Sequence, residues 1–575
     1  MATETDVQSV VHNLEEGKWK KWVQLVLILS VTAFVSCLFL IGQFRGLGHA
    51  KAMDQAQVAR EIARGHGFTT KFIRPVALTQ LLQNKGNIPA DQFPDTYNAP
   101  LNPWVNSFFL RLTRSSWQMT TKEIVYASDR LIAGVAILFF ILSVAVNFFT
   151  ARRLFDSRLA TFAACAMLIS EPFWQYAISG LPQMLMLLIF SGALYMMVRA
   201  MQVYEEGGSP TLWLILTAIL FGLLALTHGL TIWIFLGALA FVAIHFRPLG
   251  KHALIMAAVL ALCYAPWMVR NYSVCGSAFG LAPYTMFFQL RGSESDVMRS
   301  SDLDFSGLTP ISFRNKIQNQ TAEQLSNLYG NLGYSFAALT FFITLLHLYK
   351  RPVIAKFRWG VLLMFLFAML GMSIFGCSDE EPLKSNNLTI LFVPVMSFYG
   401  LAYILYLWSQ WEVHIRIFNI AFVILIYTIL GLPLIRDLLS PPANRVQWPP
   451  YIPPYISILN TWTNENEIIA SDMPWGVAWY ADRKSLWLPT TINDFIAFND
   501  YNRLGNRLIG LYLTPVSGNK SFISGIVKGE YKEWAQFIMR TVSSKDFPLR
   551  AVTGLPVDNE CVFYSDRDRW SGRTE

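Results

Sequence analysis

The feature that most constrains this fold is a series of long apolar segments separated by short polar stretches. About eleven are present, and most reach the roughly 18 residues that cross the ~30 Å hydrocarbon core of a bilayer. Only 15% of the 575 residues are charged, against about 25% in a soluble domain. We therefore predict an all-α polytopic membrane protein with spans near 22–42, 131–150, 159–172, 181–199, 211–228, 230–246, 252–269, 333–349, 359–377, 386–408 and 417–435.

Basic residues in the short loops predict the orientation. Residues 1–21 are polar and end in a Lys-rich stretch, and the apolar run that follows is too long for a signal-peptide core, which predicts an uncleaved first span. Lys and Arg favour cytoplasmic loops. With a cytoplasmic N-terminus, every inner loop is basic and an odd span number places the C-terminus outside, in the inner membrane of a cell with an envelope. The basic residues are Lys18, Lys20, Lys21, Arg152, Arg153, Arg158, Arg199, Arg247, Lys251, Lys350, Arg351, Lys356, Arg358 and Arg416.

Composition divides the chain into three parts. A cytoplasmic tail, 1–21, precedes a transmembrane domain, 22–435, which includes the outer loop 43–130. Residues 436–575 begin with a proline-rich stretch and are predicted to form an extracytoplasmic α/β domain. Alanines at helical spacing predict an amphipathic helix near 49–64 in the outer loop. In the C-terminal part we predict strands at Glu467–Ser471, Ser485–Leu488, Arg507–Leu513 and Cys561–Tyr564, and helices at 491–504 and 524–542.

Charge and side-chain distribution exclude several kinds of function. The net charge of +8 does not indicate nucleic-acid binding, because Lys and Arg do not cluster with aromatic residues. The acidic run Asp379–Glu381 is typical of a solvated loop, since adjacent carboxylates do not converge on one ion, and we expect no metal or other cofactor. Transporters carry ionisable residues or broken helices near the bilayer midplane. Here the mid-span positions are apolar, which favours binding or chemistry at the outer interface.

Four stretches at predicted outer helix ends follow one another between residues 22 and 280. The first is Met53–Arg60, which contains Asp54 and is followed by Gly65–Phe68. The others are Ala99–Trp104, then Asp129–Arg130 with Ala151–Phe155 at the two ends of the second span, and Ala265–Tyr272. In this order they resemble the polyprenyl-phosphate-sugar-dependent glycosyltransferases of the GT-C superfamily, of the protein-mannosyltransferase and aminoarabinose-transferase type (glycosyltransferase family 39).

The resemblance implies a reaction and a catalytic acid. In such enzymes a sugar on a lipid phosphate is transferred with inversion to an acceptor, which a carboxylate must orient or deprotonate. Asp54 matches the acid in the family's first loop and is the expected base, although a surface Asp is otherwise most simply a solvated residue. Glu171 is a second acid, expected to bind sugar or acceptor or to cap its loop. The family often has an acid before the fourth span, where this chain has Gln183.

The departing lipid phosphate needs cations around it. Arg270 ends a predicted span and could bind phosphate bidentately, with snorkelling to lipid head groups as the alternative. Lys384 precedes the tenth span, where the family tends to keep a basic residue. His228, in an outer hairpin, and Arg74 complete the expected phosphate-binding set, and a hydrogen-bonded loop residue is the simpler role for His228.

We therefore expect inverting transfer of a sugar from a polyprenyl-phosphate donor, as co-substrate, to an extracytoplasmic protein, lipid or glycan acceptor. Two alternatives stay open. The residue at Gln183 would suit a non-catalytic GT-C-fold subunit or scaffold in an envelope protein complex. A lipid-linked sugar transporter is the third hypothesis, and the apolar mid-span positions oppose it. Membrane lipid is an expected partner in each case, and nucleic acid in none.

Overall fold

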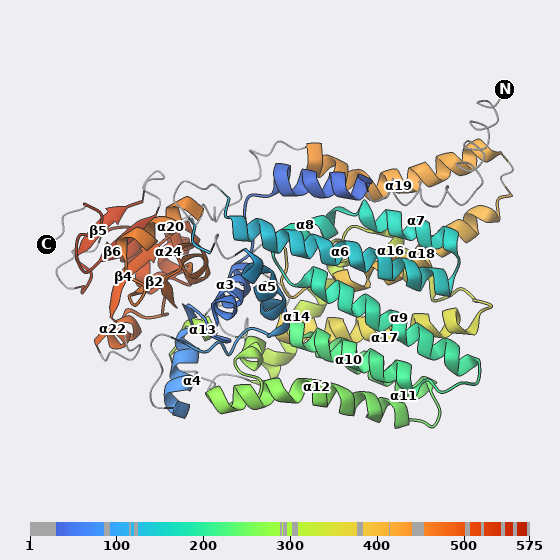
Figure 1. Cartoon of the computed structure of the whole chain (residues 1–575), viewed down its shortest axis with the longest axis horizontal. Coiled ribbons are helices and arrows are strands. Elements are labelled where there is room, and N and C mark those ends of the chain that lie inside the picture. Colours follow the sequence, from blue (N-terminus) through green and yellow to red (C-terminus); the bar gives the residue numbers. More distant parts are fainter. Residues whose placement is uncertain are drawn as a thin grey trace.

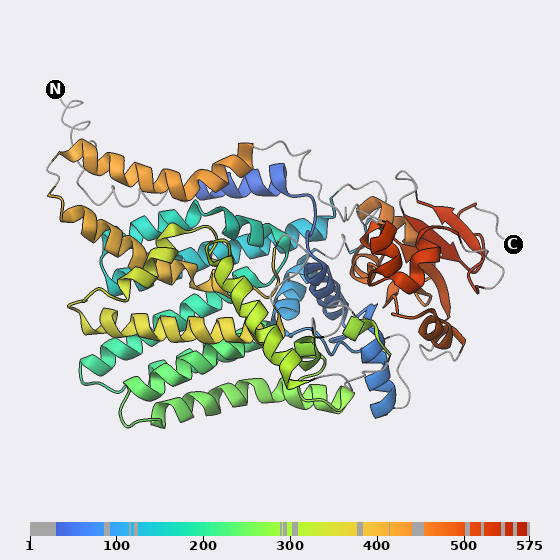
Figure 2. The same cartoon turned by 180° about the vertical axis from the view of Figure 1, so that it is seen from behind.

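A bundle of apolar helices, a mixed sheet and a group of short helices between them make up the computed structural model of the chain (Figure 1). The reverse view shows the same three parts (Figure 2). The structure describes residues 30–85, 92–113, 117–119, 125–287, 290, 296–301, 309–376, 383–412, 415–439, 453–500, 507–518, 523–541, 547–555 and 561–571.

Six helices in the described part of the chain are long and apolar enough to cross a membrane, and four more are apolar but shorter. The chain is thus a multi-pass membrane protein. The long helices are α6 (Ala127–Leu154), α9 (Gln183–Glu205), α12 (Lys251–Cys275), α17 (Pro352–Phe375), η4 with α18 (Thr389–Ser409) and α19 (Arg416–Leu439). The shorter ones are Ser30–Gln43, α7 (Ser157–Leu168), α10 (Thr211–Thr227) and α11 (Thr231–His245).

Each predicted span coincides with a helix, but one helix is much shorter than its apolar segment. Residues 22–29 and Cys377 lie outside the described residues. The segment 333–349 forms only α16 (Phe336–Thr344), whose nine residues rise about 14 Å. The Arg358 guanidinium donates to the carbonyls of Thr344 and His347, which satisfies backbone groups where the helix stops. Whether the chain crosses the membrane eleven times therefore stays a prediction.

Small residues allow the bundle helices to approach closely. A Cβ at Gly400 of α18 would lie 1.8 Å from the Ala337 carbonyl oxygen of α16. A Cβ at Gly237 of α11 would lie 2.6 Å from Met364 Cα of α17. Lipid gives no hydrophobic drive for helix association, so such backbone contact is how membrane helices gain packing energy.

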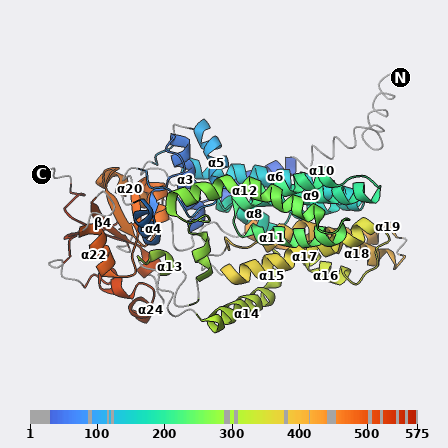
Figure 3. The same ribbon diagram turned by 90° about the horizontal axis from the view of Figure 1, so that it is seen from below.

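The short helices α3 (Ala50–Arg64), α4 (Pro75–Lys85) and α5 (Leu101–Leu112) lie between the bundle and the sheet (Figure 1). The predicted helix 49–64 is confirmed as α3. Its polar side is not in solvent, however, because 12 of its 15 residues are buried. The C-terminal region and the loop after α4 cover that side. Further along, η3 (Ala282–Phe287), α13 (Asp296–Arg299), α14 (Pro310–Ser326) and α15 (Leu328–Asn331) precede α16, and α14 lies outside the other helices, against α17 (Figure 3).

Among the described residues the sheet has six strands, in the order β1-β3-β2-β4-β6-β5. Strands β1, β3, β2 and β4 are parallel, whereas β6 is antiparallel to β4 and β5. The four predicted strands are confirmed as β2 (Ile468–Ser471), β3 (Lys484–Trp487), β4 (Leu508–Leu513) and β6 (Val562–Ser565), while β5 (Ala551–Gly554) and β1 were not predicted. β1 (Phe72–Ile73) comes from loop 43–130, so the sheet takes one edge strand from outside the predicted domain 436–575.

Helices around the sheet complete the C-terminal region. The predicted helix 524–542 is broken into α24 (Ile523–Lys528), η7 (Lys532–Trp534) and α25 (Ala535–Ile538). Trp534, fully buried, donates its indole N–H to the Pro489 carbonyl and holds the chain at this break. The remaining elements are α20 (Pro453–Trp462), α21 (Pro474–Gly476), η6 (Val477–Ala481), α22 (Ile492–Asp500) and α23 (Pro515–Gly518).

Candidate active site

Asp54 lies in the first half of α3 and is buried, with a relative exposure of 2%. Its Oδ2 atom accepts hydrogen bonds from Arg74 Nη2 at 2.6 Å and Asn98 Nδ2 at 2.8 Å. Its Oδ1 atom accepts from Gln57 Nε2 at 3.2 Å, one turn further along the helix. The sequence analysis placed Asp54 and Arg74 in one site, and the structure brings them into direct contact.

A second carboxylate lies close to Asp54. The Asn98 amide donates to Asp95 Oδ2 at 2.8 Å as well as to Asp54, so both acids share one donor. Asp95 Oδ1 in turn accepts from the backbone N–H groups of Tyr97 and Asn98, which closes a tight turn. Burial raises the pKa of Asp54 above its ordinary value; Arg74 opposes this shift and the Asp95 carboxylate adds to it. A carboxylate with a raised pKa is a stronger base than one in water.

Arg74 is positioned by the sheet. It directly follows β1, whose Phe72 and Ile73 pair with Ser485 and Leu486 of β3. Its guanidinium lies against two rings, 3.9 Å from the Phe72 centroid and 4.0 Å from the Tyr97 centroid. Cation–π contact with both rings restricts the movement of the guanidinium. The C-terminal sheet therefore sets the position of the cation that faces Asp54.

Arg270 joins the same network through the loop that precedes α5. Its guanidinium donates to the Asp95 carbonyl, to Phe68 O at 3.0 Å and to Asn271 Oδ1 at 2.9 Å. The rings of Phe68 and Trp267 lie 5.3 and 5.0 Å from it. In this structure Arg270 thus holds the loop that carries Asp95, and its role with phosphate stays a prediction.

Lys51, on α3, and His228, at the end of α10, form a second polar group. Lys51 Nζ lies 2.9 Å from His228 Nε2 and donates to Asn386 Oδ1 at 3.5 Å. The sequence analysis selected His228 but not Lys51. Lys51 stands three residues before Asp54, a spacing that puts two helical side chains on one face, and this spacing was the signal that could have identified it.

Lys384 lies in the segment that reaches this group. Its ammonium is 3.5 Å from Glu323 Oε1, and its carbonyl accepts a hydrogen bond from the Tyr176 hydroxyl at 3.2 Å. Gln183, which is fully buried, donates to the neighbouring Ser385 carbonyl at 2.7 Å. The amide at the family's acid position thus holds the backbone between Lys384 and Asn386 in place.

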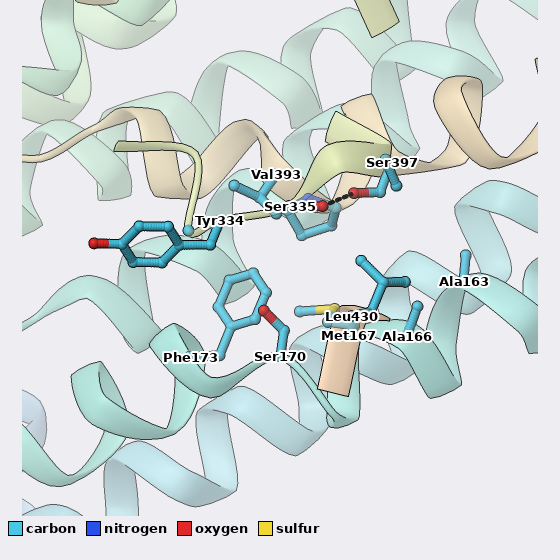
Figure 4. A pocket seen from close by; sticks show the side chains of 13 residues that line it. Ala163, Ala166, Met167, Ser170, Phe173, Tyr334, Ser335, Val393, Ser397 and Leu430 are labelled. Atoms are coloured by element: carbon cyan, nitrogen blue, oxygen red, sulfur yellow. Dashed lines mark hydrogen bonds between the residues drawn. The ribbon is translucent and has the colours of Figure 1, made fainter. Parts of the chain in front are cut away.

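Glu171 begins α8 (Glu171–Ser179) and is partly buried. Its neighbours Ser170 and Phe173 line a cavity between α7, α8, α16, α18 and α19 (Figure 4). The cavity has a volume of about 20 Å³, which is room for about one water molecule. It is too small for a substrate, and Ser335 and Ser397, whose hydroxyls lie 3.3 Å apart, are among its polar residues. The role of Glu171 stays a prediction.

A cluster of charges joins the other end of α3 to the C-terminal region. Asp482 makes ion pairs with Arg60 at 3.0 Å, Arg64 at 2.7 Å and Lys71 at 2.6 Å. Burial alone would raise the pKa of Asp482, but the three cations hold it well below its ordinary range. Arg60 also donates to the carbonyls of Ala478 and Trp479. This Asp482 cluster fixes both α3 and the start of β1.

Asp129 makes a further link between the bundle and the C-terminal region. It lies in the first turn of α6, where it is fully buried, and accepts hydrogen bonds from Trp479 Nε1 at 2.6 Å and Tyr480 Oη at 2.9 Å. Asp129, part of the Asp129–Arg130 stretch singled out in the sequence, thus connects α6 to the C-terminal region. Among the described residues no group of three or more His, Cys, Asp or Glu side chains could hold a metal ion, and metal independence stays a prediction.

With this geometry established, comparison with known proteins identifies the fold. Residues 98–269 match the family described as dolichyl-phosphate-mannose-protein mannosyltransferase. The resemblance to GT-C membrane glycosyltransferases is confirmed. The matched range includes Asn98, Glu171 and His228, whereas Asp54 and Arg270 lie outside it. No curated protein matches the chain at a significant level.

Solved structures of GT-C enzymes share the fold. The archaeal oligosaccharyltransferase AglB from Archaeoglobus fulgidus, in complex with an inhibitory peptide and a dolichol-phosphate, matches with TM-score 0.54 and 13% identity over 91% of this chain and 73% of that chain. The A. fulgidus oligosaccharyltransferase tethered with an acceptor peptide matches with TM-score 0.55 and 13% identity, over 90% of this chain and 72% of that chain. ArnT from Cupriavidus metallidurans in the apo state reaches only 0.43, at 12% identity, over 96% and 99%.

Proposed function

We propose that this GT-C chain transfers a sugar, with inversion, from a polyprenyl-phosphate donor to an acceptor on the extracytoplasmic side of the membrane. The observation that carries the proposal is the buried Asp54, which among the described residues contacts a single cation, Arg74, beside a second acid, Asp95. In the proposed topology the N-terminus is cytoplasmic, and the sheet with α3 lies outside.

The transfer is a single displacement. The acceptor oxygen or nitrogen forms a bond to the anomeric carbon on the face opposite the phosphate. The bond from that carbon to the phosphate oxygen breaks, and the lipid phosphate leaves with the electron pair. Asp54 accepts the proton of the acceptor, for which its raised pKa suits it.

The cations divide into two groups in this mechanism. Lys51, His228 and Lys384 are proposed to bind the departing phosphate, because Lys51 lies on the same side of α3 as Asp54 and contacts His228 directly. Arg74 and Arg270 act on the base instead: Arg74 faces Asp54, and Arg270 holds the loop of Asp95. Glu171 is proposed to bind the sugar or the acceptor.

The test is transfer by Asp54→Asn membranes. Membranes that contain the full chain are given radiolabelled polyprenyl-phosphate sugars, and label in acceptors is measured with release of polyprenyl phosphate. Loss of a general base lowers such a rate by about 10²–10⁴-fold. Asp494→Asn, in α22, makes the same chemical change away from α3 and should leave transfer intact.

Undiminished transfer in the Asp54→Asn membranes would remove this residue from the mechanism. If no donor is turned over by the unaltered chain, while the Asp54→Asn gene still complements a deletion, the non-catalytic subunit is the better description. Movement of intact donor across the membrane without cleavage would instead support a transporter.

A further inference from the structure

The carboxyl ends of three neighbouring strands meet beside the Asp54–Arg74 pair. Strands β1, β3 and β2 are adjacent and parallel. Arg74 follows β1, Trp487 is the last residue of β3, and Trp475 lies shortly after the end of β2. In open sheets with parallel strands, ligands bind outside the carboxyl ends of the strands. This edge of the sheet is therefore where a ligand is expected.

Aromatic rings cluster at this edge. Trp475 and Trp487 lie 5.9 Å apart at 87°, and Phe72 contacts both rings edge-on, at 6.2 and 5.5 Å. Both tryptophans and Tyr97 are partly exposed, whereas Phe72 is buried beneath them. Arg74 lies against Phe72 and Tyr97, so the rings adjoin the proposed base through one side chain.

Trp479 and Tyr480, which follow Trp475 closely in the sequence, differ from it in burial and in hydrogen bonding. Trp479 and Tyr480 are 0% and 1% exposed, and their N–H and O–H groups donate to Asp129. Their role is packing between the sheet region and α6. Trp475, four residues before Trp479, is instead partly exposed. It lies in α21, which packs on α3, the helix that carries Asp54.

Several buried polar atoms around the rings have no hydrogen-bond partner among the described residues. They are Trp475 Nε1, Arg74 Nε, Asn98 Oδ1 and Thr96 Oγ1. Buried polar atoms are nearly always paired in native proteins. Arg74 contacts Phe72, and both Arg74 and Asn98 contact Asp54, so the unpaired atoms of these two residues favour a polar ligand beside Asp54. Aromatic walls with a few convergent polar groups are typical of small-molecule sites.

The turn that carries Trp475 is held rigidly. Asp472, which is fully buried at the end of β2, accepts hydrogen bonds from Thr514 N at 2.9 Å and Ser517 Oγ at 2.6 Å. These bonds tie the start of α21 to the loop after β4. A rigid platform lowers the ordering cost of binding.

We propose that Trp475, with Trp487 and Tyr97, binds the pyranose ring of a saccharide, and that this saccharide is the acceptor. The apolar face of the sugar stacks on the indole, and its hydroxyls pair with the unsatisfied donors and acceptors. The inference rests on the proposed function, because it takes Asp54 as the base for the acceptor hydroxyl. It selects a glycan among protein, lipid and glycan acceptors.

The test is saturation-transfer difference NMR on the full chain in a detergent without a sugar head group. The probes are methyl α-mannoside, methyl α-glucoside and methyl N-acetyl-β-glucosaminide. We expect saturation of ring protons for at least one probe, and about tenfold weaker binding in Trp475→Ala. Trp475→Phe keeps a stacking ring and should bind between the two. Trp411→Ala, a tryptophan 75% exposed after α18, is the matched control and should bind normally.

Two further measurements determine whether the sugar bound at Trp475 belongs to the acceptor or to the donor, and whether its binding is independent of catalysis. Saturating polyprenyl-phosphate sugar leaves probe binding unchanged if the probe occupies an acceptor site, and displaces it if the ring at Trp475 belongs to the donor. Asp54→Asn should bind the probe normally, which distinguishes failure of catalysis from failure of this site. Absence of probe binding by the unaltered chain, displacement by donor, or equal binding by Trp475→Ala with an unchanged melting temperature would each overturn the proposal.

Discussion

Two buried carboxylates at opposite ends of α3 have pKa values shifted in opposite directions. One, Asp54, belongs to the first half of the helix, and the other, Asp482, contacts its second half. Asp54 contacts one guanidinium, lies near a second acid, and has a raised pKa. Asp482 contacts three cations and has a lowered pKa. Both are almost fully buried, so burial alone does not decide their chemistry. The number of neighbouring cations distinguishes them: beside one, Asp54 can take a proton, and beside three, Asp482 stays ionised at neutral pH.

The same helix therefore serves as anchor and as active-site element. Arg60 and Arg64, in its second half, bind Asp482, while Lys51 and Asp54, in its first half, face the polar groups proposed to act on substrate. Lys71 connects the two ends, because it pairs with Asp482 and precedes the strand that positions Arg74. Four measurements test this division of α3 into an anchoring half and an active-site half.

The largest effect is expected from Asp482→Ala. The substitution leaves Arg60, which is 1% exposed, without its buried carboxylate. Removing one partner of a buried ion pair destabilises by about 3–5 kcal/mol. Thermal unfolding of the purified chain should show a clear fall in melting temperature, with Glu533→Ala, at an exposed acid of η7, as control. An unchanged melting temperature would show that the Asp482 cluster is not an anchor.

The pH dependence of transfer should respond to Arg74. Ionisation of Asp54 is favoured by Arg74, so kcat/KM should rise with pH through the pKa of Asp54, and Arg74→Gln should move this limb to higher pH. An Arg neighbour shifts an Asp by about 1–3 units. Asp482→Asn should leave the limb where it is. A limb that stays in place in Arg74→Gln would mean that another group titrates.

Acid should lower the stability of the folded chain by protonating Asp482. Asp482 has a folded pKa below its ordinary value of 3.8, so its contribution to stability is present above that value and is lost as pH falls below it. The loss is on the order of 2 kcal/mol for such a group. Melting temperatures measured between pH 6 and pH 2 should fall more steeply below pH 4 for the unaltered chain than for Asp482→Asn; parallel curves would contradict the assignment.

At Lys51 the expected effect is on binding of the lipid phosphate and not on stability. A charge-assisted hydrogen bond contributes about 1.5–3 kcal/mol, so Lys51→Ala should weaken binding of polyprenyl phosphate by roughly tenfold or more, while Lys51→Arg keeps the charge and most of the affinity. Lys356→Ala, an exposed lysine of α17, is the control. Equal affinity in Lys51→Ala, measured by native mass spectrometry, would place the phosphate elsewhere.

The apolar pattern by itself determined most of the helical architecture. Spans such as 131–150 and 417–435 appear as α6 and α19 because ~20 apolar residues have few alternatives to a membrane-crossing helix. Strands β2, β3, β4 and β6 were also predicted from the sequence, within one or two residues of their bounds. β1 was not, because a strand of two residues carries no pattern of its own and exists only where β3 offers an edge.

Which of these residues contact one another depends on the tertiary fold. Asp54 and Arg74 were selected from the sequence, but their partners Asn98 and Asp95 come from a loop whose course depends on Arg270. The polar side of α3 resembled a solvated surface, yet it is buried, because Asp482, more than 400 residues later, supplies the opposite charge. Local sequence determines helices through backbone hydrogen bonding and hydrophobic length, whereas charge pairing across such distances depends on how the chain folds in three dimensions.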